Sequence, residues 1–231
     1  MICPRVSEGF DWAEIRAWES ELGPDLKGLR LPFLPFKGSA ELGAFRGGEI
    51  QLCHDERCLY VWAHLLDEDI FNLATRRNER TWESGDVLEL FLKRENQEAY
   101  YEFHVTPENQ TMQVRFDSAA HFRSLQGQPN QRELFAALLI GEPLFESRTC
   151  IRPGQSWDVM AALPLLSVME VGELGRDLIW QVSFCRYDYS RGEDGCLLSP
   201  RLSSTSKYLS GNFHEQCFWS RLHFHLGGIA S

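Results

Sequence analysis

Apolar and polar residues alternate with a period of two through most of the chain. For example, Leu88, Leu90 and Leu92 alternate with Glu89 and Phe91. A strand with one buried face shows this period, because successive side chains point to opposite sides of a sheet. The pattern predicts an all-β fold, an antiparallel β-sandwich of two sheets. Its predicted strands are residues 49–54, 59–65, 87–92, 100–105, 112–116, 145–152, 157–163, 180–185 and 221–226.

Helical spacing of apolar residues is confined to the beginning of the chain. Trp12, Ile15, Trp18 and Leu22 recur at intervals of three or four residues, and Asp11 can cap a helix over 11–22. A second short helix is expected from residue 164 to 171. No linker or repeat divides the sequence. We therefore expect one domain, residues 1–231, in which residues 1–44 form a short N-terminal helical extension packed on a sandwich of residues 45–226.

Two polar stretches lack either period and are expected to be long loops. They run from residue 117 to 131 and from residue 188 to 212. Loops of this length are usually functional or mobile, so both could border a binding site.

Composition and charge narrow the classes of function. The chain has 231 residues, of which 43% are apolar, and a formal net charge of -10. Nucleic acids and anionic membranes attract basic surfaces, and the only basic group, Arg76, Arg77 and Arg80, lies among acidic residues. We expect no nucleic-acid partner and no membrane partner.

The N-terminus and the cysteines bear on the compartment. The first residues lack the charged and apolar regions of a signal peptide. Seven cysteines without a CxxC pair fit neither a zinc knuckle nor a disulfide framework. Buried free thiols favour the cytoplasm, although the sequence leaves the localisation unknown.

Trp82 and Glu89 are the first candidates for binding chemistry. Trp82 lies where a polar loop enters a strand, so its indole could stack on the flat C–H face of a sugar or fold over the core as a lid. Glu89 lies between Val87 and Phe91 on the side of its strand opposite the leucines. It could bind a ligand, or it could form a partly buried ion pair with Arg115 or Arg186.

The next strand adds three candidates. Tyr100, Glu102 and His104 share one face and alternate with the core residues Tyr101 and Phe103. Together with Glu89 they could line a shallow cleft on a polar, aromatic surface, although a solvated sheet face has the same pattern. Arg115, the candidate partner of Glu89, is included in the predicted binding set.

Metal-binding patterns are weak. His223 and His225 share a strand face, but no third ligand lies nearby in the sequence, so no metal site is predicted there. The acidic turn Asp67-Glu68-Asp69 could coordinate calcium through its carboxylates, or it could simply be solvated. No other cofactor is expected.

The order of the segments resembles carbohydrate-binding module family 9, a group of β-sandwiches related to DOMON domains. The resemblance covers residues 45–226. It rests on the motifs Leu59-Tyr60-Val61-Trp62-Ala63, Asp67-Glu68-Asp69, Trp82, Asp86-Val87-Leu88-Glu89-Leu90-Phe91, Tyr100-Tyr101-Glu102-Phe103-His104-Val105, Trp157-Asp158-Val159 with Leu163-Pro164, Phe184-Cys185-Arg186, and Asn212-Phe213-His214 with Phe218-Trp219 and Leu222-His223-Phe224.

The resemblance implies a non-catalytic module that holds a mono- or oligosaccharide between two aromatic rings. The first ring would be Trp82 and the first carboxylate Glu89. Glu102 and His104 occupy positions where well-studied members carry an amide and an arginine. The second ring comes from the loop before the last strand, where Tyr208 could substitute for a tryptophan and Phe213 is a weaker candidate.

Three other functions are compatible with the sequence. A haem-binding, DOMON-type electron-transfer module would need axial ligands such as His104 and Met112. A carbohydrate-active enzyme could use Glu89 or Glu102 with His104 as acid and base. A protein-interaction sandwich would present its aromatic face to another chain.

Overall fold

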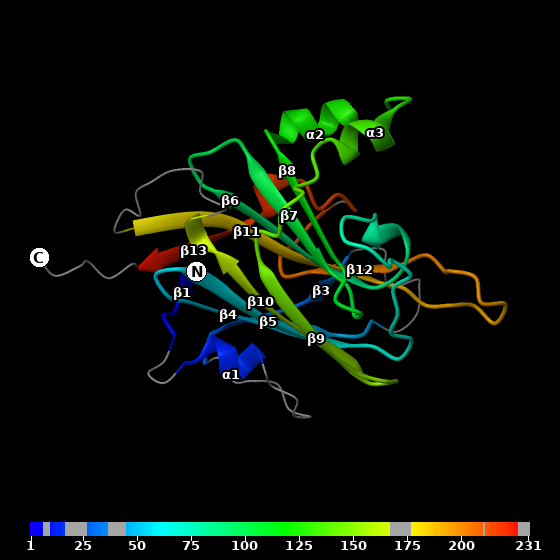
Figure 1. The fold of residues 1–231 in the computed structure, drawn as a ribbon, viewed down its shortest axis with the longest axis horizontal. Helices are drawn as coiled ribbons and strands as arrows, with labels where there is room; N and C mark the ends of the chain where they lie inside the picture. Colours follow the sequence, from blue (N-terminus) through cyan, green and yellow to red (C-terminus); the bar gives the residue numbers. More distant parts are fainter. Residues whose placement is uncertain (7–9, 17–26, 37–44, 167–176, 210, 226–231) are drawn as a thin grey trace, which may run out of the picture.

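Two β-sheets packed face to face form the body of the protein (Figure 1). The computed structural model describes residues 1–6, 10–16, 27–36, 45–166, 177–209 and 211–225. Within them the smaller sheet has five strands, in the order β2 (Leu29–Pro32), β4 (Gly48–His54), β5 (Cys58–Leu66), β10 (Ser156–Pro164) and β9 (Glu146–Arg152). The larger has eight: β1 (Ile2–Cys3), β13 (Ser220–His225), β11 (Asp177–Asp188), β6 (Val87–Arg94), β7 (Tyr100–Val105) and β8 (Thr111–Phe116), with β12 (Arg201–Ser204) on β11 and β3 (Leu34–Pro35) on β12.

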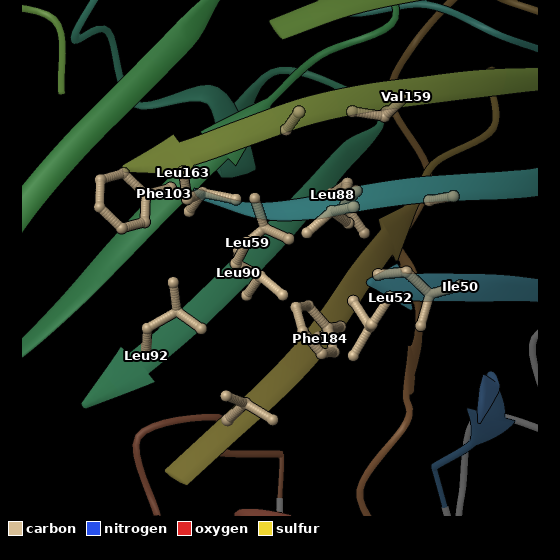
Figure 2. Close-up of a cluster of buried hydrophobic side chains, with 14 of the residues drawn as sticks. Ile50, Leu52, Leu59, Leu88, Leu90, Leu92, Phe103, Val159, Leu163 and Phe184 are labelled. Atoms are coloured by element: carbon tan, nitrogen blue, oxygen red, sulfur yellow. The ribbon is translucent and has the colours of Figure 1, made fainter. Parts of the chain in front are cut away.

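The apolar positions of the alternating segments meet between the sheets. Leu88, Leu90 and Leu92 of β6 are fully buried in this layer. Leu59 of β5 and Val159 of β10 approach them from the opposite sheet (Figure 2). Removing this apolar surface from water is the main favourable term in the folding free energy. The predicted antiparallel sandwich is confirmed; among the described strands, β1 pairs with β13 in parallel, and an isolated parallel bridge joins Arg5 to His54.

The outer face of the larger sheet is buried, contrary to the prediction of a polar surface. Phe91, Tyr100 and Phe116 belong to a second apolar cluster on this face. Helices α2 (Ala119–Leu125) and α3 (Gln131–Ala136) lie over it beside β8 (Figure 1). The expected loop from residue 117 to 131 is therefore mostly helical, and Ser118 caps α2 by accepting a hydrogen bond from the His121 amide.

The N-terminal extension covers part of the smaller sheet. Helix α1 (Trp12–Arg16) begins after Asp11, whose carboxylate accepts a hydrogen bond from the Ala13 amide as predicted. Trp12 packs on Tyr60 of β5. Residues 17–22 of the predicted helix, and residues 167–171 of the other one, lie outside the described part of the chain. None of the described helices is long and apolar enough to span a membrane.

A buried ion pair joins the two sheets. Arg186 on β11 donates a hydrogen bond of 3.0 Å to Asp67, which follows β5, and both side chains are almost completely buried. Arg186 is thus committed to Asp67 rather than to Glu89. The other acids of this turn, a candidate for calcium or for solvation, also contact arginines, Glu68 with Arg46 and Asp69 with Arg191. A cation there would have to displace three guanidinium groups.

We expect Arg186→Met to lower the free energy of unfolding by about 3–5 kcal/mol, because it leaves the buried carboxylate of Asp67 without its charged partner. Arg5→Met is the matched control, since the ion pair of Arg5 with Glu56 is exposed and worth at most about 1 kcal/mol. Urea unfolding of both variants measures the difference. Equal losses would contradict the structural role of the Arg186 pair.

Candidate functional site

A cleft of about 440 Å³ opens on the outer face of the larger sheet. The carboxylates on its floor come from β6 and β7, and its walls come from α2, α3, the loop before β6 and residues 211–214. Its volume is within the usual range of about 300–1,000 Å³ for small-molecule sites. The residues that line it are Arg80, Trp82, Glu89, Glu102, Phe122, Gln126, Gln131, Phe135, Tyr187, Gly211, Asn212, Phe213 and His214.

Several buried hydrogen bonds fix the backbone that carries Trp82. The residue lies in a single 3₁₀ turn, η2 (Thr81–Glu83). The Asn72 side-chain amide donates to the Thr81 carbonyl at 2.9 Å, and the Tyr189 hydroxyl donates to the Trp82 carbonyl at 2.7 Å. Gly85 has a φ of 147°, and a Cβ there would lie 2.4 Å from the Phe71 carbonyl oxygen. The loop therefore requires glycine at this position.

The Trp82 ring is half-buried at the wall of the cleft, neither fully solvated nor enclosed in the core. The Arg80 guanidinium lies over it, 4.7 Å from the ring centroid. The Phe135 and His104 rings meet it edge to face, at centroid distances of 5.2 and 5.6 Å. These contacts hold the indole in one orientation, which lowers the entropy that a ligand would lose on stacking against it.

The two carboxylates on the floor of the cleft meet at one imidazole. His104 Nε2 lies 2.6 Å from Glu102 Oε1 and 3.2 Å from Glu89 Oε1. Glu89 and His104 are directly opposite in the pairing of β6 with β7, while Glu102 is two residues from His104 on the same face. On the other side of the ring, His104 Nδ1 lies 2.7 Å from the Thr81 hydroxyl.

The pKa values of the two acids are shifted in opposite directions. Burial raises the pKa of Glu89 well above its usual value, and the charge of Glu102 raises it further. Burial also opposes ionisation of Glu102, but His214 and His104 outweigh it, and the pKa of Glu102 is lowered. Glu102 thus carries the negative charge of the pair, and Glu89 favours its neutral form.

His214 supplies a polar group at the cleft wall. Its Nε2 lies 3.7 Å from Glu102 Oε2, and its Nδ1 lies 2.8 Å from the Tyr100 hydroxyl. Burial lowers the pKa of His214 to about 4, against the attraction of Glu102. Its imidazole places hydrogen-bonding nitrogens at the wall of the cleft, beside Glu102 and Tyr100.

Four of the seven predicted binding residues do not line the cleft. His104 lies behind the carboxylates, Tyr100 contacts His214 at the cleft wall, and Arg115 pairs with Asp117. Tyr208 is buried in the second apolar cluster, where its hydroxyl lies 2.9 Å from the Phe213 carbonyl oxygen. The expected second ring at Tyr208 is therefore absent from the cleft. Trp82, Glu89 and Glu102 are the predicted residues that line it.

Several residues of the cleft were missed by sequence reasoning. Arg80 belongs to the basic group among acidic residues, for which no binding role is predicted. Phe122 lies on a helix where a loop is expected, and Phe135 lies on a helix that is not predicted. The spacing of Phe122 and Leu125 was a helical signal within the expected loop. His214 belongs to a quoted motif, but no role was assigned to it.

The positions of the side chains on the floor of the cleft argue against glycoside hydrolysis and against haem ligation. Glu89 and Glu102 contact the same imidazole nitrogen, so they lie on one side of any ligand. Glycosidases instead place two carboxyl groups on both sides of the scissile bond. His104 and Met112 are cross-strand neighbours on one face of the sheet. Their side chains are therefore parallel and do not oppose each other as two axial haem ligands would.

Comparison with known proteins identifies the class of fold. No protein-family model matches the sequence, and no curated protein matches it. Among solved structures, a Bacteroides uniformis protein for which carbohydrate binding has been suggested is 16% identical, with a TM-score of 0.66. The similarity covers 97% of this chain and 98% of that one.

Two structures of a family 9 carbohydrate-binding module from Caldicellulosiruptor kristjanssonii are also similar, each with a TM-score of 0.53. The complex with cellotriose is 14% identical over 81% of this chain and 79% of that one. The complex with glucose is 13% identical over 82% of each chain. The chain therefore has a fold like that of the family 9 carbohydrate-binding modules, as its motifs predicted.

We expect Tyr208→Phe to lower the free energy of unfolding by about 1 kcal/mol, because it removes a buried hydrogen bond to the Phe213 carbonyl. Affinity for any ligand of the cleft should change less than about twofold, which is under half a kcal/mol. Urea unfolding and calorimetric titration measure the two quantities. A tenfold loss of affinity would instead make Tyr208 a binding residue.

Proposed function

We propose that the cleft binds a mono- or oligosaccharide without catalysing its conversion. The observation that carries this proposal is the meeting of a half-buried indole, Trp82, with two buried carboxylates in one open cleft. An aromatic face suits the C–H face of a pyranose, and carboxylates accept strong hydrogen bonds from vicinal hydroxyls.

In the proposed complex, Trp82 contacts the sugar ring while Glu102 accepts hydrogen bonds from its hydroxyl groups. Glu89, in its neutral form, both donates and accepts. Arg80 adds guanidinium donors beside the indole. His104 does not touch the sugar and instead holds the two carboxylates. Tyr187, which is half-buried and lines the cleft, is the candidate for the second ring in place of Tyr208; Phe213 lines the cleft too but is buried as deeply as Tyr208.

The similar structures support this choice among the functions that the sequence allows. Family 9 modules with the same fold have been solved with glucose and with cellotriose. Both sugars are therefore the first ligands to test. Absence of heat with either sugar or with a wider panel of mono- and oligosaccharides, from a folded sample, would contradict the proposal.

We expect Trp82→Ala to weaken sugar binding at least tenfold, a loss of about 1.4 kcal/mol, because the stacking surface is removed. Isothermal titration with a sugar that binds the wild type measures the change. Trp82→Phe should retain part of the affinity, since a smaller ring can still stack.

Trp12→Ala is the matched control. Trp12 is also half-buried, but it packs on the smaller sheet, away from the cleft. This variant loses an indole without changing the site and should bind as the wild type does. If Trp82→Ala bound the sugar as tightly as the wild type does, the indole would not take part in binding.

A further inference from the structure

Three metal-ligating side chains converge on the floor of the cleft. Glu89, Glu102 and His104 each offer one donor atom, and these atoms all lie within 4.8 Å of one another. The register of β6 and β7 produces this arrangement, because it pairs Glu89 with His104 and places Glu102 two residues away on the same face. The donors therefore stand on two neighbouring strands of a rigid sheet.

The donor separations suit a small divalent ion. The contacts of His104 Nε2 with the two carboxylates are 2.6 and 3.2 Å. Donors about 2.0 Å from a tetrahedral zinc ion lie roughly 3.3 Å apart, so side-chain shifts of less than about 1 Å would admit the ion. One imidazole and two carboxylates also supply the ligand types that zinc and other first-row divalent metals accept.

His104 is oriented as a metal-ligating histidine is. Its Nδ1 lies 2.7 Å from the hydroxyl of Thr81, and Nε2 is directed toward the carboxylates. Metal-binding histidines usually have their second ring nitrogen held by such a partner, which fixes the ring and its tautomer. Thr81 is held in turn, since its carbonyl accepts the Asn72 amide.

One donor atom lacks a hydrogen-bond partner. Glu102 Oε2 is buried and makes no hydrogen bond, and His214 Nε2 lies 3.7 Å from it. A buried carboxylate oxygen without a hydrogen bond is unfavourable, so an additional ligand is expected near it. Glu102 lines the cleft, which gives an ion a path from solvent.

The second acidic cluster differs in its counter-charge, although both oxygens of Asp188 in it also lack a hydrogen-bond partner. Asp67, Asp86 and Asp188 have equally close donor atoms, but Arg186 and Arg201 lie among them. Both oxygens of Asp86 also accept backbone hydrogen bonds. Around Glu89 and Glu102, by contrast, the ion pairs formed within the described residues are with histidines only.

We propose that Glu89, Glu102 and His104 bind one first-row divalent metal ion, with Zn²⁺ as the probe. Three protein ligands leave at least one coordination position open to the cleft. The proposal concerns metal binding alone and stands or falls separately from sugar binding. A sugar titration of the metal-free protein tests the function proposed above without involving the ion.

The test is calorimetric titration of the EDTA-treated, dialysed protein with ZnCl₂. The wild type should bind one equivalent of zinc. Glu102→Gln should weaken this binding at least about a hundredfold, since loss of even a supporting partner of a metal ligand costs roughly 10–100-fold in affinity. Thr81→Val should weaken binding about tenfold or more by freeing the imidazole. Glu83→Gln is the matched control, because it makes the same change at an exposed carboxylate beside Trp82.

Cys196 and Cys217 are exposed thiols that could hold zinc by themselves. A variant with both cysteines replaced by serine should still bind one equivalent of zinc. Co²⁺ bound to the protein should give a ligand-field spectrum without a thiolate charge-transfer band. Zinc should also raise the melting temperature of the wild type but not that of folded Glu102→Gln. The proposal is overturned if no zinc binds, if Glu102→Gln binds as the wild type does, or if the serine variant loses the ion.

Discussion

The buried contact between the Thr81 hydroxyl and His104 joins the two parts of the candidate site. Thr81 precedes Trp82 in the loop, and His104 belongs to the strand that carries Glu102. His104 also contacts Glu89 on the neighbouring strand. One imidazole therefore sets the position of the indole relative to both carboxylates. Without this contact the wall and the floor of the cleft would move independently, and neither a sugar nor an ion would meet a preorganised set of partners.

The sandwich supplies the rigidity behind that contact. The apolar layer between the sheets fixes β6 and β7, and the Arg186–Asp67 pair connects the larger sheet to the end of β5. On the outer face, α2 and α3 cover part of the sheet beside the cleft, and Phe36, Tyr208, Phe213 and Trp219 cover another part. Low exposure of Glu89 and Glu102 makes their hydrogen bonds stronger than they would be on the open surface first expected.

Local patterns predicted the fold well, because strand alternation and cap residues act over a few positions. They assigned Leu88 and Leu90 to the core and placed Trp82 and Glu89 in the site. They failed where distant segments decide the outcome. Whether the face of Glu102 is solvated depends on α2 packing over it, and the partner of Arg186 comes from residue 67. Neither fact is encoded in the neighbouring residues.

Sugar binding in the cleft requires that Trp82 contact the bound sugar. The most direct measurement is a ¹H–¹⁵N NMR titration with glucose and cellotriose that follows the tryptophan indole N–H signals, with Trp82 assigned by its loss in Trp82→Phe. The Trp82 signal should shift with sugar, while those of the buried Trp157 and Trp180 should stay in place. A Trp82 signal that does not move while sugar binds elsewhere would contradict this role of Trp82.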